Sequence, residues 1–369
     1  MGKIISTLLF QPPDNPTPLG RSKYFWLTTS RGSQIPAFHI TQPHARFTVL
    51  YSHGNAEDLG MIHNYIAELS RLLYVNILAY DYTGYGLGTK NIENIENKSL
   101  ECSPSEENCY SDIEAAYDYL ANVKKIAPQQ IILYGRSVGS GPSCYLAQKL
   151  GLRTKNEGEE GLGGVILHSP FVSVCRVVID LGIENKFDLF PNISRMKDIT
   201  CPTFIIHGTN DGVVPFYHGR MLHDTLPGDI RYKPFWADSM GHNNIESEMC
   251  SLFIKKLQRF FLFLIKTQKR SGGVQDEEVE QGLALLEMEH KQGPPPRKRR
   301  KRPQVEIVVN NVPELDEDYE SVVPKAKLNR TKSPTSVAEA NAFKLQGGEK
   351  WGAFQPTSEF VEIECSIMS

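Results

Sequence analysis

The sequence predicts an α/β fold with a mostly parallel sheet of eight strands and helices on both faces. Short apolar runs alternate with longer amphipathic stretches through residues 21–268, which is typical of strands alternating with helices. One run, 131–134, is bounded by Gln130 and Gly135, as expected of a buried parallel strand. The eight expected strands are 23–29, 34–40, 46–52, 75–80, 131–134, 165–168, 203–206 and 231–236. The expected helices are 59–73, 111–127, 246–265 and one that follows Gly139.

The first two expected strands flank Ser30-Arg31-Gly32-Ser33, a turn typical of a β-hairpin. Two polar stretches, 87–108 and 152–164, interrupt the pattern and are interpreted as surface insertions. The apolar stretch 171–190 opens a region, 171–199, where a hydrolase of this layout would carry a small lid. A helix that covers the core is an equally acceptable interpretation of the same residues.

A nucleophilic serine is predicted at the turn after the fifth strand. Gly135-Arg136-Ser137-Val138-Gly139 matches G-x-S-x-G and stands between an expected strand and an expected helix. This context is typical of the nucleophile elbow of α/β-hydrolases, in which a sharp turn exposes the serine hydroxyl above the sheet. The alternative is an ordinary glycine-rich turn, because the motif alone recurs by chance.

Backbone donors for an oxyanion are expected beside this serine. His53-Gly54-Asn55 follows the third strand, where these hydrolases place a second oxyanion donor. We therefore predict that the N–H groups of Asn55 and Val138 form the oxyanion hole. The His53 side chain is expected only to pack and hydrogen-bond locally.

An acid and a base follow later strands. Asp211 lies on the loop after the run 203–206, and His242 lies on the loop after 231–236. With Ser137 they follow the order Ser, Asp, His that is typical of this fold. Asp211 could instead cap a helix near Pro215, and each residue alone favours a structural role. Asp81 is a rival acid that precedes the serine in the chain, and we expect it to brace its loop.

Composition excludes several classes of function. A net charge of −3 gives no whole-chain signal for nucleic-acid binding. The seven cysteines contain no C-x-x-C pair, which indicates neither a zinc site nor a disulfide framework and favours a reducing cytoplasm. No apolar run reaches the roughly 18 residues of a membrane span, and the N-terminal apolar residues are too few for a secretory signal. The predicted chemistry needs no metal or cofactor.

The two ends of the chain differ from the middle. Residues 1–20 are predicted to be a flexible, acylated segment, because Gly2 and Ser6 match the N-myristoylation pattern. Residues 269–369 are predicted to be a disordered tail. Its basic cluster, 297–302, would serve nuclear import or attraction to anionic lipid, or would be a solvated run of charge. The favoured location is the cytoplasmic face of membranes, with a peripheral lipid anchor.

Several stretches between residues 52 and 265 resemble the alpha/beta hydrolase domain-containing protein 17 family. The matching stretches are His53-Gly54-Asn55-Ala56-Glu57-Asp58-Leu59-Gly60, Tyr80-Asp81-Tyr82-Thr83-Gly84-Tyr85-Gly86, Ile131-Ile132-Leu133-Tyr134-Gly135-Arg136-Ser137, Leu167-His168-Ser169-Pro170, Phe190-Pro191-Asn192-Ile193, Ile205-Ile206-His207-Gly208-Thr209 and Gly241-His242-Asn243. The resemblance implies a serine hydrolase that removes palmitate from cysteines of membrane-attached proteins. It places nucleophile, acid and base at Ser137, Asp211 and His242. The family's N-terminal cluster of palmitoylated cysteines is missing, since the first cysteine is Cys102, and acylation of Gly2 would replace that anchor.

The leading hypothesis is therefore a hydrolase of S-palmitoyl-cysteine whose partners are S-acylated membrane proteins and the cytoplasmic membrane surface. The catalytic residues alone do not distinguish thioesters from oxygen esters, so a lipase or carboxylesterase is the first alternative. A catalytically silent scaffold that binds partners through its tail is the second, and the three filled catalytic positions argue against it.

Overall fold

Eight strands of the described residues form one mostly parallel sheet, as predicted. The computed structural model describes residues 9–20, 23–89, 103–178 and 188–270. All of these belong to one of the two units into which the chain divides, and the other unit falls outside the described residues. The predictions for Gly2, for the tail beyond residue 270 and for the basic cluster 297–302 therefore concern residues outside the described part of the chain.

The strand order is β1-β2-β4-β3-β5-β6-β7-β8. β2 is antiparallel to both β1 and β4, and all other neighbours are parallel. The expected hairpin joins β1 and β2, with Thr29 N donating to Ser33 O. The strands are β1 (Phe25–Thr28), β2 (Gln34–Ile40), β3 (Thr48–Ser52), β4 (Asn76–Tyr80), β5 (Ile131–Arg136), β6 (Gly164–His168), β7 (Thr203–Gly208) and β8 (Phe235–Ala237).

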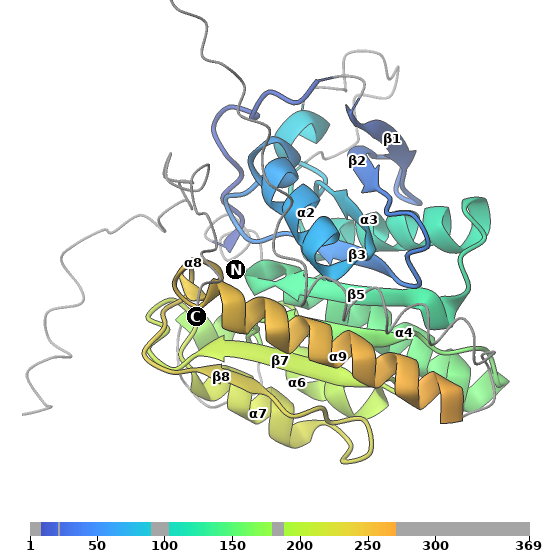
Figure 1. Cartoon of the computed structure of the whole chain (residues 1–369). Helices are drawn as coiled ribbons and strands as arrows, with labels where there is room; N and C mark the ends of the chain where they lie inside the picture. Colours follow the sequence, from blue (N-terminus) through green and yellow to red (C-terminus); the bar gives the residue numbers. More distant parts are fainter. Residues whose placement is uncertain (1–8, 21–22, 90–102, 179–187, 271–369) are drawn as a thin grey trace, which may run out of the picture. The chain divides into compact units, whose positions relative to one another are not determined.

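Helices cover both faces of the sheet (Figure 1). Alternate residues of β5 face different cores: Leu133 packs in a cluster with α3 and α4 residues, and Tyr134 packs in a cluster with α2 and α9 residues. The α-helices are α2 (Leu59–Leu73), α3 (Glu106–Asp118), α4 (Ser140–Glu157), α5 (Val174–Val178), α6 (Asn192–Arg195), α7 (Tyr217–Thr225), α8 (Ile245–Glu248) and α9 (Cys250–Arg270). The shorter turns are η2 (Gly86–Thr89), the π-helix η3 (Tyr119–Val123), η4 (Pro128–Gln130), η5 (Ser137–Gly139) and η6 (Met196–Asp198).

Helix α2 has the predicted bounds because both of its ends carry local signals. The side chain of Asp58 caps its first turn by accepting a hydrogen bond from Met61 N. Tyr74 ends the helix in the left-handed conformation, with φ of 55°. Its apolar stripe, which includes Ile62, Ile66 and Leu69, is buried against the sheet.

Several predicted bounds were wrong. The last strand was expected at 231–236, but β8 covers only Phe235–Ala237. Pro234 has no N–H for a sheet ladder, and Arg231 forms only an isolated bridge with Thr203. Helix α3 begins at Glu106 rather than 111, because the Ser105 side chain caps it. The closing helix is divided into α8 and α9.

Where the structure describes the predicted insertions and lid, parts of them belong to the helices and the core of the fold. Helix α4 continues to Glu157, so the first half of 152–164 is helical rather than an insertion. Residues 90–102 of the other insertion and 179–187 of the lid region lie outside the described residues. In the described part of the lid region, Phe171, Val174 and Phe190 are buried in the core, which agrees with the core-covering interpretation. None of the described helices is both long and apolar enough to span a membrane.

Candidate active site

Three side chains predicted to act together lie in one hydrogen-bonded row at the carboxyl ends of parallel strands. The His242 Nε2 atom is 2.9 Å from Ser137 Oγ, and His242 Nδ1 is 2.7 Å from Asp211 Oδ2. Ser137 follows β5, Asp211 follows β7 and His242 follows β8. Because parallel strands end at the same edge of the sheet, residues 105 positions apart in the chain meet there.

The turn at Ser137 has the strained backbone of a nucleophile elbow. Ser137 has φ of 51°, in the left-handed region that residues with a Cβ rarely adopt. A Cβ on Gly135 would lie 2.5 Å from the carbonyl oxygen of Gly139, and one on Gly139 would lie 2.1 Å from that of Ser52. Both glycines of the motif are therefore required, since any side chain would collide with backbone. Ser137 itself remains partly exposed.

Asp211 orients the histidine and also shapes its own loop. Its Oδ1 accepts hydrogen bonds from the N–H groups of Val213 and Val214, while Oδ2 faces His242. Helix α7 begins later, at Tyr217, so Asp211 caps the preceding turn rather than the helix. His207 Nε2 also lies 3.3 Å from Oδ2. Burial alone would raise the pKa of the Asp211 carboxyl, but the hydrogen bonds from the two histidines lower that pKa well below its ordinary value.

The loop that contains Asn55 begins beside the turn at Ser137. Gly139, in the turn after Ser137, lies against the backbone of Ser52 and His53. Among the described residues, no group accepts a hydrogen bond from the N–H of Asn55 or of Val138. Both N–H groups are therefore free to donate to an oxyanion.

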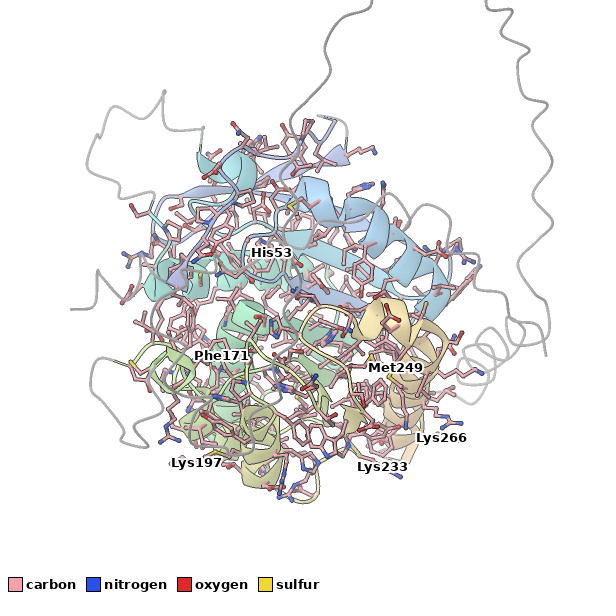
Figure 2. The ribbon with its side chains drawn as sticks, turned by 90° about the vertical axis from the view of Figure 1, so that its left-hand side faces the viewer. His53, Phe171, Lys197, Lys233, Met249 and Lys266 are labelled. Atoms are coloured by element: carbon pink, nitrogen blue, oxygen red, sulfur yellow. The ribbon has the colours of Figure 1, made fainter. Side chains whose placement is uncertain are left out.

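The His53 and Asp81 side chains have the local roles predicted for them. His53, labelled in Figure 2, is fully buried, and its Nδ1 lies 2.8 Å from the carbonyl oxygen of Gly54. Asp81 accepts a hydrogen bond from Leu59 N at the start of α2 and lies 3.5 Å from His53 Nε2. Asp81 thus braces its loop.

The residue before Ser137 connects the loops of the candidate site, and its role was not predicted from the sequence. Arg136 donates from Nη1 to Glu57 Oε1 at 2.8 Å, from Nη2 to Asn243 Oδ1 at 2.9 Å and from Nε to Glu246 Oε1 at 3.2 Å. Glu57 also accepts from Gly54 N at 2.7 Å. An arginine between a buried apolar run and the serine of the motif was a usable signal, because a buried guanidinium requires acidic partners.

This network keeps fixed charges beneath the site. Burial acts to lower the pKa of Arg136, but Glu57 and Glu246 raise it, so the guanidinium stays charged. Burial would raise the pKa of Glu246, yet His168 and Arg136 lower it below its ordinary value. Burial lowers the pKa of His168 itself to about 4, which keeps that ring neutral near pH 7. Within the described ranges, no group of three His, Cys, Asp or Glu side chains is arranged to hold a metal ion.

Comparison with known proteins identifies the family. No family model matches the chain. The chain is 37% identical over 238 residues to Alpha/beta hydrolase domain-containing protein 17B of Xenopus tropicalis, an alignment that covers 64% of this chain and 74% of that protein. The human protein of the same name is 36% identical over the same length and the same shares. The chain belongs to the alpha/beta hydrolase domain-containing protein 17 family. The expected family and fold are thereby confirmed, and the chain is a hydrolase of the α/β-hydrolase fold.

Solved structures agree with this fold. The esterase Pf2001 of Pyrococcus furiosus superposes with a TM-score of 0.50 at 15% sequence identity, covering 68% of this chain and 98% of that structure. At this identity the likeness concerns the fold alone.

Proposed function

We propose that the protein is a serine hydrolase that cleaves fatty-acyl thioesters, S-palmitoyl-cysteine in particular, on membrane-associated proteins. The observation that supports this most strongly is the continuous row from Asp211 through His242 to Ser137, with gaps of 2.7 and 2.9 Å. Each gap is a hydrogen bond, so a proton can pass from the serine to the imidazole without rearrangement.

In the first step the Ser137 hydroxyl adds to the acyl carbonyl carbon. Asp211 is ionised and accepts Nδ1–H, so Nε2 of His242 is left to accept the hydroxyl proton. The carbonyl oxygen becomes an oxyanion, which the N–H groups of Asn55 and Val138 stabilise. One such donor contributes about 3–4 kcal/mol in related enzymes.

The intermediate then expels the cysteine sulfur, and the His242 imidazolium returns its proton to that sulfur. A thiol has a pKa of about 8.5, so the thiolate leaves with little help from an acid. Water next attacks the acyl-enzyme, with His242 again accepting the proton. The products are the free thiol and a fatty acid, and Ser137 is regenerated.

The substrate class is inferred from two further features. Membership of the family supports protein-bound palmitate as the acyl donor. The Gly2 pattern supports membrane attachment, which would bring the enzyme to S-acylated proteins at the cytoplasmic surface. An oxygen ester would use the same residues, so lipase or carboxylesterase activity is the alternative that an assay must exclude.

The test compares two substrates and one variant. Purified full-length protein is given an S-palmitoyl peptide and a monoacylglycerol of equal chain length, and a fluorophosphonate probe reports the nucleophile. We expect faster cleavage of the thioester, with turnover and labelling both lost in Ser137→Ala. Turnover should fall at least about 10³-fold, since the hydroxyl is the nucleophile.

Each alternative has its own outcome. Cleavage of the monoacylglycerol with an intact S-palmitoyl peptide would replace the proposal by a lipase. Absence of labelling and of turnover in the native protein would favour a silent scaffold. Labelling that persists in Ser137→Ala would show that another residue is the nucleophile.

A further inference from the structure

A segment near the N-terminus is bound to the side chain of the proposed oxyanion donor. The Asn55 Nδ2 group donates to the carbonyl oxygen of Leu9 at 2.6 Å, and Gln11 N–H donates to Asn55 Oδ1 at 3.0 Å. The side-chain amide thus holds both backbone groups that flank Phe10, as a neighbouring strand would. Tyr85 completes the set by donating its hydroxyl to Asn55 Oδ1 at 2.6 Å.

The same segment is attached again at the other end of the loop. Thr17 N–H donates to Asp58 Oδ2 at 2.7 Å, while Oδ1 of Asp58 accepts from Met61 N at the start of α2. A Cβ on Gly60 would lie 2.4 Å from the carbonyl oxygen of Thr17, so the two backbones are in close contact. Residues 9–17 therefore run alongside the loop 55–58 and are held at both ends.

Between these attachments, Phe10 reaches the helix that follows the nucleophile. Its side chain is 6% exposed, and its ring centroid lies 6.4 Å from that of Tyr85 and 6.1 Å from that of Phe190. Phe190 in turn packs so closely on α4 that a Cβ on Gly141 would lie 2.3 Å from its ring. The segment thus connects the loop of Asn55 to the first turn after Ser137.

The loop restrains the backbone before Asn55, because Gly54 N–H donates to Glu57 Oε2 at 2.7 Å and Gly54 O lies 2.8 Å from His53 Nδ1. Gly54 precedes Asn55 and has no side chain, and Ala56 follows with φ of 57°, a conformation that residues with a Cβ rarely adopt. The hydrogen bonds of the Asn55 side chain add a restraint at Asn55 itself. A backbone N–H stabilises an oxyanion only when it is held at the correct position before the reaction.

We propose that residues 9–17 are a positioning element of the active site, which holds Asn55 so that its N–H faces the oxyanion. This inference rests on the proposed function, because Asn55 acts there as an oxyanion donor. Gly2, the proposed acylation site, stands seven residues before Leu9. The same stretch of chain would then carry the membrane anchor and support catalysis.

The hydrogen bonds between the Asn55 side chain and the backbone of residues 9–11 are called the clamp. The test separates the effect of the clamp from that of the Asn55 backbone N–H. Asn55→Ala removes the side-chain hydrogen bonds but keeps the backbone N–H, and Gln11→Pro removes the N–H that donates to Asn55 Oδ1 and to the Tyr85 hydroxyl oxygen. Asn15→Ala, an exposed position in the same segment, is the matched control. Turnover of a short-chain nitrophenyl ester is measured with full-length protein, because this substrate requires neither a thioester nor a membrane.

We expect kcat to fall about 10- to 100-fold in both clamp variants, with KM within about twofold of the native value, since a displaced donor affects the transition state and not the ground state. Affinity for a boronic acid, which forms a tetrahedral adduct on serine, should fall by a similar factor. Asn15→Ala should match the native protein in both measurements. A purely structural role would instead lower thermal stability without this selective loss.

Two results would overturn the inference. One is an unchanged kcat in folded Asn55→Ala; the other is a loss in Asn55→Ala with none in Gln11→Pro and none in Thr17→Pro, which would show that the attachments at residues 11 and 17 do not support Asn55. Should Gln11→Pro fail to fold, Thr17→Pro removes the second attachment and must also lower kcat selectively. A native protein that neither turns over the ester nor reacts with a fluorophosphonate contradicts the proposed function, whereas an active native protein with unaffected variants contradicts this inference alone.

Discussion

Arg136 Nη1 lies 2.8 Å from Glu57 Oε1, and both side chains are shielded from solvent. This ion pair joins the residue before Ser137 to the loop after β3. The same guanidinium holds Asn243, the neighbour of His242. One buried cation therefore fixes the mutual position of three segments that contribute to the candidate active site.

Replacing Arg136 should destabilise the fold strongly. Arg136→Met leaves the carboxylates of Glu57 and Glu246 buried without a counter-charge, and removal of one partner from a buried pair typically costs about 3–5 kcal/mol. Arg136→Lys keeps the charge but not the three directed contacts, so a smaller loss is expected. Urea unfolding of the three proteins measures both differences. Equal stability of the methionine variant and the native protein would contradict the prediction.

Asp211→Asn should lower kcat by about 10³- to 10⁴-fold with little change in KM. The amide oxygen can still accept from Val213 and Val214, so the loop should keep its shape. Its NH₂ group, however, would face Nδ1 of His242 and favour the tautomer that cannot accept the serine proton. Kinetics with a soluble ester and a melting curve test this together. A large fall in melting temperature would show that the loss is structural.

The stability of the protein should decrease as pH rises through the acid range because of Asp112. Burial raises the pKa of this carboxyl from 3.8 to about 7, although it accepts two hydrogen bonds from Thr83. Between about pH 4 and pH 7 the folded protein binds a proton that the unfolded chain does not, so the free energy of unfolding falls by up to about 1.4 kcal/mol per pH unit. Asp112→Asn removes this titration.

The measurement is urea unfolding of native protein and Asp112→Asn at pH 5 and pH 7. The native protein should lose more stability than the variant across this interval, and other titrating groups cancel in the difference. An equal pH dependence of the two proteins would exclude Asp112 as the cause.

Gly139→Ala should be poorly tolerated. Its Cβ would lie 2.1 Å from the carbonyl oxygen of Ser52, and backbone on a central strand cannot give way as a flexible side chain can. We expect a loss of at least about 1–3 kcal/mol and a displaced elbow. Gly228→Ala is the control, since nothing lies within 4 Å of the added carbon. Similar thermal stability of both variants would refute this account.

Gly2→Ala should release the protein from membranes, because alanine at this position cannot be myristoylated. Fractionation of cells with a labelled myristate analogue compares native and variant protein. The basic cluster 297–302 is the proposed second attachment, so a separate experiment replaces these residues by neutral ones. Unchanged membrane recovery and absence of label in the native protein would count against acylation.

Local patterns predicted those elements whose limits are set by their own residues. The strand Gln34–Ile40 and the helix Leu59–Leu73 have the predicted bounds, since the turn at 30–33, an Asp58 cap and an apolar stripe are all readable along the chain. The start of α3 was also signalled, by Ser105 followed by two glutamates, but its polar surroundings were interpreted as an insertion. The break between α8 and α9 has no comparable local signal.

By itself, the sequence determined the α/β class, the elbow and the order of Ser137, Asp211 and His242, because each follows a strand and parallel strands end at one edge. Only the tertiary structure decided which distant groups surround them: the partners of Arg136 and the clamp between Asn55 and the backbone of residues 9–11. Such hydrogen bonds join positions 44 to 110 residues apart. Their formation depends on strand order and loop path, which no local pattern of residues specifies.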